Sequence, residues 1–399
     1  MEQFPNISLE SGASREEVIE AARVAGEVLA RDAAARDREW RHPFEEVNWL
    51  KGTGLFNVRV PARFGGLGFG YGTWAQVLKH LAVGDPNVAM IPIGHVGVAE
   101  VVNIVGSEEQ KAKIFGQMRD GVYFGNAITE IGTKTKNDML TKVSQKGNGY
   151  VVDGRKFYTT GSVHADRIGV VGLNEEGLPL MAFVDADAEG VTIIDDWRGM
   201  GQRTTASGTM KFDNVQVDAF DVVAMYEIEE GRTILPPSAQ LPHSAIDLGI
   251  ALAALRDGKE FICSQARPWV EAEVDAAADD WYILRHFGQM SAAAHAADLM
   301  LSRAGDALDV AEEQLTDELL VKASIHIAES LALSIEVALD ASVRIFQLCG
   351  TKSTLEQEGL DRHMRNARTH TLHNPVDYKY WNIGKYYLKD EWPPSKTNR

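Results

Sequence analysis

Residues 365–380, RNARTHTLHNPVDYKY, hold the densest group of chemically useful side chains in the sequence. His370 and His373 lie three residues apart, and an imidazole donates or accepts a proton near neutral pH. Arg365 and Arg368 precede them, and a guanidinium group binds phosphate through paired N–H donors. These arginines therefore favour an anionic cofactor, with ordinary surface ion pairs as the alternative. A zinc site built from His363, His370 and His373 would need a further ligand and is disfavoured.

The overall composition excludes several classes of function. The chain has 399 residues, a net charge of −17 and 45% hydrophobic residues. An acidic chain of this kind is a poor partner for nucleic acid or an anionic membrane. It has no run of 18 apolar residues, and its first ten residues lack the pattern of a signal peptide. The two cysteines, Cys263 and Cys349, have no metal-like or redox-like spacing, so we expect packed thiols in a cytoplasmic protein.

Helical patterns dominate both ends of the chain. SREE at 14–17 and SEEQ at 107–110 match the capping box that begins a helix, and the glycine-rich segment 63–72 predicts a loop between them. Residues 317–349 keep a helical apolar pattern up to Gly350, which predicts one helix about 50 Å long.

The middle of the chain has the pattern of short strands. Asp153-Gly154 between two β-prone runs predicts a hairpin, and LPLMAFVD, GVTII and GTMKFDNVQV predict further strands. Strands and helices do not alternate, so we expect an antiparallel barrel or sandwich and no dinucleotide-binding sheet. The predicted domains are a helical domain at 1–125, a β domain at 126–235 and a helical bundle with a tail at 236–399.

This order of elements resembles the acyl-CoA dehydrogenase family. GSEEQKAKIFGQMRDGVYFGNAITE and DGRKFYTTGS resemble its two flavin-contacting segments, and GQRTTASGTMKFDNVQV resembles its later barrel strands. The resemblance spans nearly the whole chain. It implies an α+β fold with an N-terminal helical domain, a central antiparallel β-barrel or sandwich and a C-terminal four-helix bundle.

Departures from the family pattern redirect the expected chemistry. Where the dehydrogenases place a glutamate base after a motif similar to RNARTHTL, this sequence has His373-Asn374-Pro375, so acyl-CoA oxidation loses its general base. Pro375 also predicts that a helix ends near Asn374. The segments FGNA, DDWRGMGQRTTASG, SQARPWVEAEVDAAADDWYILRHFG and RTHTLHNPVDYK resemble the flavin-dependent monooxygenases of this fold, such as the dibenzothiophene monooxygenases.

That resemblance implies a set of catalytic residues. His373 is expected to stabilise or protonate a C4a-hydroperoxyflavin, with His370 sharing the site, and His95 to line the pocket. Asn126 and Thr160, expected in two strands, would offer neutral hydrogen bonds to the flavin. Each of these residues also has a purely structural alternative. His373 would then be a capping or core histidine, and His95 a core histidine in an apolar helix. Asn126 would be a turn or strand-end residue, and Thr160 an ordinary strand threonine.

The resemblance also implies the cofactor and its contacts. The cofactor would be FMN, bound as FMNH₂ together with O₂. It would be contacted by Asn126, Thr129, Tyr158, Thr160 and Trp197, and Arg285 with Arg365 and Arg368 would bind its phosphate. No nicotinamide-binding GxGxxG follows a strand, so a separate NAD(P)H:flavin reductase must supply reduced flavin.

The expected enzyme is a two-component monooxygenase of a small hydrophobic organosulfur compound, assembled as a homotetramer. Three alternatives stay open: hydroxylation of an aromatic carbon or an amine nitrogen, an FAD-dependent acyl-CoA dehydrogenase with a base relocated to Glu356 or Glu358, and a catalytically silent scaffold.

Overall fold

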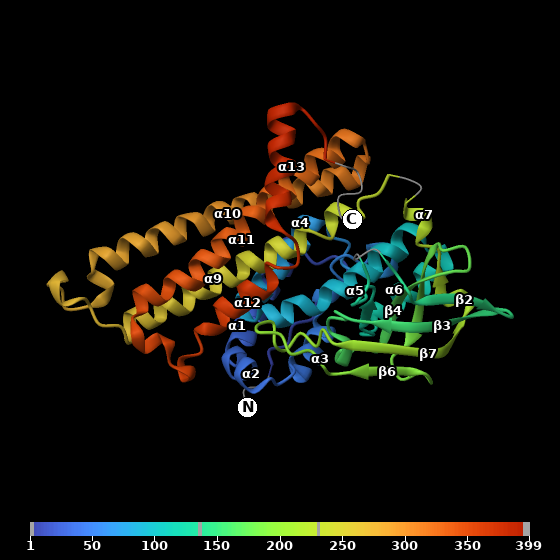
Figure 1. Cartoon of the computed structure of the whole chain (residues 1–399), viewed down its shortest axis with the longest axis horizontal. Helices are drawn as coiled ribbons and strands as arrows, with labels where there is room; N and C mark the ends of the chain where they lie inside the picture. The colour runs from blue at the N-terminus through green and yellow to red at the C-terminus, as the bar shows by residue number, and fades with distance from the viewer. Residues whose placement is uncertain (1–3, 135–137, 230–231, 394–399) are drawn as a thin grey trace.

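The computed structural model describes residues 4–134, 138–229 and 232–393 (Figure 1). Residues 135–137, which follow the flavin-contacting segment expected at 106–130, lie outside this part of the chain. A β-sheet lies on one side of the molecule and the long C-terminal helices lie on the other, as Figure 1 shows. The α+β fold class predicted from the sequence is confirmed.

The N-terminal region is helical, as predicted. Both capping boxes are present, at Ser14 and at Ser107. The glycine-rich segment 63–72 forms a loop at residues 65–70, between a 3₁₀ turn that ends at Phe64 and a helix that begins at Tyr71. The helices are α1 (Arg15–Ala30), α2 (Ala33–Glu39), α3 (Phe44–Thr53), α4 (Tyr71–Gly84), α5 (Pro86–Val105) and α6 (Glu108–Arg119), and the 3₁₀ turns are η1 (Leu55–Asn57) and η2 (Ala62–Phe64).

Helix α5 is the central element of the fold. Within the described residues it is the one helix long and apolar enough to cross a bilayer, and 67% of its apolar 18-residue stretch is buried in the protein. It packs against α4, strand β1 (Phe124–Ala127) and helix α9 (Leu241–Ser264), and therefore lies between the sheet and the long helices. This burial explains its apolar composition as that of a core helix.

One eight-stranded sheet forms the middle region. Its order is β6-β7-β3-β2-β4-β5-β8, with β1 paired to β4. Contrary to the expected antiparallel arrangement, the sheet is mixed, because β1 and β2 both run parallel to β4. The strands are β1 (Phe124–Ala127), β2 (Lys142–Lys146), β3 (Gly149–Lys156), β4 (Arg167–Leu173), β5 (Pro179–Asp185), β6 (Val191–Ile194), β7 (Thr209–Asp218) and β8 (Val222–Val223).

The predicted hairpin at Asp153-Gly154 is wrong. The observed hairpin joins β2 to β3 and turns at residues 147–148. Asp153-Gly154 falls inside β3, at a register shift against β7. A Cβ on Gly154 would lie 2.4 Å from the Thr141 hydroxyl, and Asp153 accepts the backbone N–H of Asn214. The dipeptide therefore forms a β-bulge, the other structure that favours glycine in a strand.

The C-terminal region forms the predicted bundle of four helices. The long helices α9 (Leu241–Ser264), α10 (Trp281–Gln314) and α11 (Asp317–Cys349) pack together, and the shorter α12 (Asp361–His370) packs on α9 and α11. The end of α11 at Gly350 is confirmed. Helices α7 (Tyr226–Glu229) and α8 (Leu235–Ser238) precede the bundle, and α13 (Val376–Lys389) follows it along α11. Cys349 is buried as expected, whereas Cys263 is exposed.

Candidate active site

The loop at residues 195–208 joins strands β6 and β7 and packs against helix α12. The backbone N–H of Gln202 donates to Asn366 Oδ1 at 2.7 Å, and that of Gly201 donates to Thr369 Oγ1 at 3.0 Å. A Cβ on Gly201 would lie 2.1 Å from the carbonyl oxygen of Arg365, so only glycine fits there. The loop therefore brings residues of the sheet region next to the helix that carries His370.

Aromatic side chains line this junction. Tyr158 is 52% exposed and has a φ of +58°, an unfavourable conformation for a bulky residue. Its ring meets the Trp197 indole edge-on at 6.1 Å between centroids, and Trp197 Nε1 donates to the Gln202 carbonyl at 2.7 Å. Gln202 and Ala206 in the facing loop also have positive φ. Backbone strain of this kind gathers at functional sites because it sets side chains in directions that relaxed backbone does not allow.

Neutral hydroxyl groups lie beside the aromatic residues. Thr160 Oγ1 and Ser207 Oγ are 2.8 Å apart, and Ser207 Oγ is 2.7 Å from Thr205 Oγ1. Contrary to expectation, Thr160 and Tyr158 lie in the segment after β3, which ends at Lys156. That segment is held by the opposite loop, since Gly161 N–H donates to the Thr205 carbonyl. The hydroxyl chain offers donors and acceptors without a formal charge.

Asn126 and His95 lie where β1 meets α5. A Cβ on Gly94 would come within 2.8 Å of Asn126 Oδ1, so the helix and the amide are in close contact. His95 Nδ1 accepts the backbone N–H of Phe124 at 3.0 Å, and burial lowers the pKa of His95 to about 3. The neutral ring must therefore carry its proton on Nε2, a buried donor with no partner among the described residues. His95 is thus a packed core histidine with an unused N–H donor, and its role in the pocket stays a prediction.

A buried ion pair supports the segment that follows β1. Lys156 Nζ lies 2.8 Å from Glu130 Oε1 and also donates to the Ile128 carbonyl. Despite partial burial, the Lys156 hydrogen bond and the N–H groups of Leu140 and Thr141 lower the pKa of Glu130 to about 2. Thr129 contributes its carbonyl oxygen, which accepts the N–H of Phe157 at 2.9 Å. This pair fixes the backbone next to Asn126 and Tyr158.

The histidines of the C-terminal motif meet helix α9. His370 Nδ1 is 2.6 Å from Asp247 Oδ1, and His370 Nε2 is 3.2 Å from His243 Nδ1. The ring of His373 lies on that of His243, with 3.8 Å between centroids. Helix α12 ends at His370, earlier than predicted, so His370 and His373 do not share a helix face. His373 instead follows in a turn and is exposed to solvent.

The three arginines lie in different surroundings. Arg365 is bound by Asp37 and Asp361, and its Nη1 also donates to the Met200 carbonyl at 3.3 Å. Arg368 is exposed and makes no ion pair within the described residues. Helix α10 begins at the end of the bundle away from the sheet (Figure 1), and Arg285 lies exposed in its second turn. The phosphate-binding role of all three stays a prediction.

Several residues at this junction were not singled out in the sequence. They are His243, Asp247, Gln202, Ser207, Asn366 and Thr369. His243 and Asp247 carry a usable signal, because they lie four residues apart in the mainly apolar first part of helix α9, residues 241–255. Polar residues at this spacing share a helix face. The others could not be found, since their contacts depend on a loop conformation.

The junction has the properties that a planar heteroaromatic cofactor requires. The Gln202 amide is buried, yet neither its oxygen nor its nitrogen has a partner among the described residues, and the same is true of Thr204 Oγ1. Buried orphan groups of this kind are satisfied by a ligand or by water. Together with the exposed Tyr158 and the edge-on Trp197, they form a setting that fits a flavin ring with polar edges and an apolar face.

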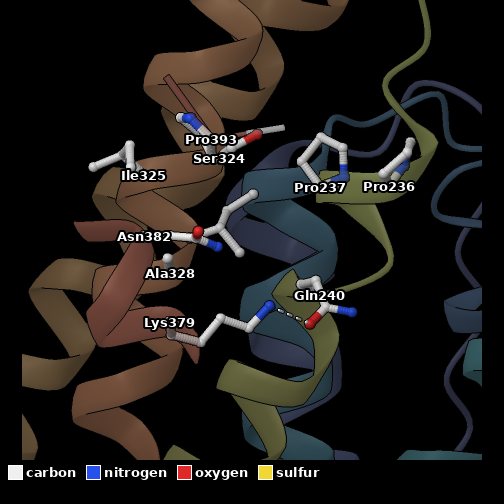
Figure 2. A pocket seen from close by; sticks show the side chains of 10 residues that line it. Pro236, Pro237, Gln240, Ser324, Ile325, Ala328, Lys379, Asn382 and Pro393 are labelled. Carbon is white, nitrogen blue, oxygen red and sulfur yellow. Dashed lines mark hydrogen bonds between the residues drawn. The ribbon is translucent and has the colours of Figure 1, made fainter. Parts of the chain in front are cut away.

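A separate hollow lies between α8, α9, α11 and α13 (Figure 2). Its wall contains Pro236, Pro237 and Gln240, and the Lys379 ammonium donates to Gln240 Oε1 at 3.0 Å. None of the predicted site residues lines it. Gln240 lies one turn before His243, so this hollow adjoins the histidine cluster without being part of it.

Comparison with known proteins places this geometry in a family. The acyl-CoA dehydrogenase N-terminal, middle and C-terminal domains match residues 14–122, 125–215 and 241–378. The chain is 33% identical over 391 residues to dibenzothiophene monooxygenase of Mycolicibacterium goodii, covering 94% of each. It is 28% identical over 386 residues to the probable FMNH₂-dependent monooxygenase SfnC of Pseudomonas putida, covering 94% of this chain and 95% of SfnC.

A solved structure shows the same fold. FMN-bound TdsC from Paenibacillus sp. A11-2 superposes with a TM-score of 0.91 at 24% identity, covering 96% of this chain and all of that one. The sequence resemblance to acyl-CoA dehydrogenases and to the monooxygenases of their fold is thereby confirmed.

Proposed function

Because this chain belongs to the acyl-CoA dehydrogenase family, in the group that contains the dibenzothiophene monooxygenases, we propose that it is an FMNH₂-dependent monooxygenase of a small hydrophobic organosulfur compound. Reduced FMN, when bound, would supply the electrons that activate O₂, and the activated oxygen would be carried on the C4a carbon of the flavin as a hydroperoxide. The observation that carries the proposal is that His373, which stands where the resemblance places the dehydrogenase carboxylate, lies 3.8 Å from the buried His243 ring.

The residues of the junction have distinct tasks in this reaction. Tyr158 and Trp197 cover the apolar part of the ring, whereas Asn126 and Thr160 offer neutral hydrogen bonds that place no charge in a dry pocket. His95 presents a buried N–H donor that stays neutral over the working pH range. His373 moves or holds the proton that oxygen transfer requires, since its ring is exposed and an imidazole can both donate and accept a proton.

The alternative dehydrogenase gains no support from the geometry. Glu356 and Glu358 are in an exposed 3₁₀ turn, and Glu358 accepts a hydrogen bond from Gln265. A base that removes an α-proton has to face a pocket from which water is excluded. An exposed carboxylate in another part of the fold does not meet this requirement.

The phosphate of FMN would be bound with help from a second copy of the chain. Arg285 lies in the second turn of α10, which begins at the end of the bundle away from the sheet, whereas the ring-binding residues adjoin the sheet. Trp269, Val270, Trp281 and Leu284 near this end are all exposed, and an apolar patch of this kind marks a protein interface. We therefore propose a homotetramer in which Arg285 of one subunit binds the phosphate of the FMN held by another. We also propose a cytoplasmic location and a separate NAD(P)H:flavin reductase as the source of FMNH₂.

The experiment that tests the function is oxygenation by the purified protein with reduced FMN in air-saturated buffer. Dibenzothiophene, indole and butyryl-CoA serve as probes for sulfur, aromatic carbon and acyl chains. Formation of dibenzothiophene sulfoxide, together with an absorbance band of oxygenated flavin that decays faster in His373→Ala, supports the proposal. Reduction of bound FAD by butyryl-CoA without added reductant would establish the dehydrogenase, and oxidation of indole alone would establish a carbon hydroxylase.

A further inference from the structure

The buried histidine cluster extends beyond the residues that the reaction was expected to use. Four side chains from three segments form a row: Asp247 and His243 of α9, His370 of α12 and His373 of the following turn. Asp247, His243 and His370 are each at most 5% exposed, whereas His373 is exposed. A row of titratable groups that runs from the core to an exposed ring is expensive to bury, so it calls for a functional reason.

We propose that Asp247 and His243 are positioning residues for His373, and that with His370 they form a buried chain which accepts one proton from the site. This proposal rests on the proposed monooxygenase function. It assigns the two α9 residues a role in proton handling, and it explains why an exposed histidine is stacked on a buried one.

The hydrogen bonds define the resting state of the chain. The Asp247 carboxylate accepts His370 Nδ1–H, so the neutral His370 ring has a lone pair on Nε2. His243 Nδ1–H then donates to that lone pair, which leaves the lone pair of His243 on its own Nε2. The direction of both bonds follows from the carboxylate, because it can only accept. Asp247 therefore sets the tautomer of two rings.

The same bonds allow one proton to be stored. When His243 Nε2 takes up a proton, His243 Nδ1 releases its own proton to His370 Nε2. The His243 ring is then neutral again, and the positive charge rests on His370 beside the Asp247 carboxylate. One N–H bond forms for each that breaks, and no electron is transferred. The opposite charges offset part of the cost of burying the imidazolium.

The charges around His243 favour this direction of transfer. Burial, His373, His370 and Lys379 of α13 hold the pKa of His243 well below its usual value, so a proton does not remain on that ring. Burial raises the pKa of Asp247, while His370 counteracts the rise. Among the described residues these are the titratable groups that act on His243 from α9, α12, α13 and the turn between them. His243 is thus a relay and His370 the store.

Two substitutions test the chain, with one matched control. Asp247→Asn keeps the shape and removes the charge, and His243→Phe keeps a ring under His373 and removes both nitrogens. Ser244→Ala is the control, because Ser244 lies on the same helix and is equally buried but bonds to Ser330 and Ser334 of α11. If the chain handles protons, both variants lower kcat on the order of 100-fold with an unchanged KM and change the pH profile of kcat, whereas Ser244→Ala keeps the native profile.

A second readout needs neither flavin nor substrate. Nuclear magnetic resonance of ¹⁵N-histidine-labelled, flavin-free protein should show a protected, low-field Nδ1–H of His370 that moves upfield in Asp247→Asn. The proposal is overturned if both variants keep the native pH profile of kcat, or if the low-field signal is absent from the native protein. If the signal is present but no probe is oxygenated, the monooxygenase function fails, and with it the catalytic role of an intact chain.

Discussion

The backbone N–H of Gln202 donates to the side chain of Asn366 at 2.7 Å, and through this bond helix α12 fixes the loop that carries Trp197. Asn366 is 1% exposed, so its removal leaves a buried donor without a partner. We expect Asn366→Ala to lower the free energy of unfolding by about 1–3 kcal/mol and to weaken FMN binding. Urea unfolding and fluorescence titration with FMN measure the two effects. Unchanged FMN affinity would show that the loop keeps its conformation without this bond.

Replacement of Thr160 by valine should separate catalysis from stability. The substitution removes one hydroxyl, and Ser207 keeps its contact with Thr205 at 2.7 Å. We expect the melting temperature to change little and kcat to fall roughly 100-fold, as for the loss of one preorganised donor. Thr205→Val provides the comparison, since it breaks the other end of the same hydroxyl chain. Equal turnover by Thr160→Val and the native enzyme would exclude a contact between this hydroxyl and the reacting atoms.

His95 should make the protein sensitive to acid. Its pKa is about 3 in the folded protein and near 6.5 when the chain unfolds, so between these values only the unfolded state takes up the proton. Stability contributed by the neutral ring is complete above pH 6.5 and is lost as the pH falls toward 3, by about 1.4 kcal/mol per unit. The native protein should therefore lose about 2 kcal/mol more than His95→Gln between pH 7 and pH 5. Urea unfolding of both proteins at the two pH values measures this difference, and parallel losses would contradict it.

The buried pair of Lys156 and Glu130 supports the flavin-facing segment. Lys156→Met leaves the Glu130 carboxylate without its cation, and we expect a loss of about 3–5 kcal/mol. The double variant with Glu130→Gln should recover part of this loss, because the neutral amide needs no cation and its one oxygen still accepts the N–H group of either Leu140 or Thr141, which bond to different carboxylate oxygens in the native protein. Chemical unfolding of the native, single and double variants gives the three values. A double variant no more stable than Lys156→Met would show that the uncompensated charge is not the cause.

Arg285 should affect FMN binding without affecting the fold of one subunit. The side chain is exposed and lies against the Trp281 ring, so Arg285→Ala should change the free energy of unfolding by less than about 0.5 kcal/mol. We expect weaker binding of FMN and unchanged binding of riboflavin, which has no phosphate. Arg63→Ala, another exposed arginine, serves as control. Light scattering accompanies the titrations, and a native protein that is monomeric while it binds FMN tightly would exclude the exchange of Arg285 between subunits.

Much of the fold was determined by local sequence. The capping boxes at Ser14 and Ser107 and the end of α11 at Gly350 lie where the patterns predicted them, because the groups involved are within a few residues of each other. Asp153-Gly154 shows the limit of this reasoning. The same dipeptide suits a turn and a bulge, and its contact with Thr141 and Asn214, far along the chain, decided between them.

The candidate site also has some features that local sequence indicates and others that depend on contacts between distant residues. The family resemblance predicted His373 and Trp197 as site residues from their motifs, without any knowledge of the fold. It could not reveal that Asn366 holds the Trp197 loop, or that Asp247 and His243 lie beneath His373. These contacts join residues more than 120 positions apart. Only the packing of α9 against α12 brings them within hydrogen-bonding distance, and no local preference encodes that packing.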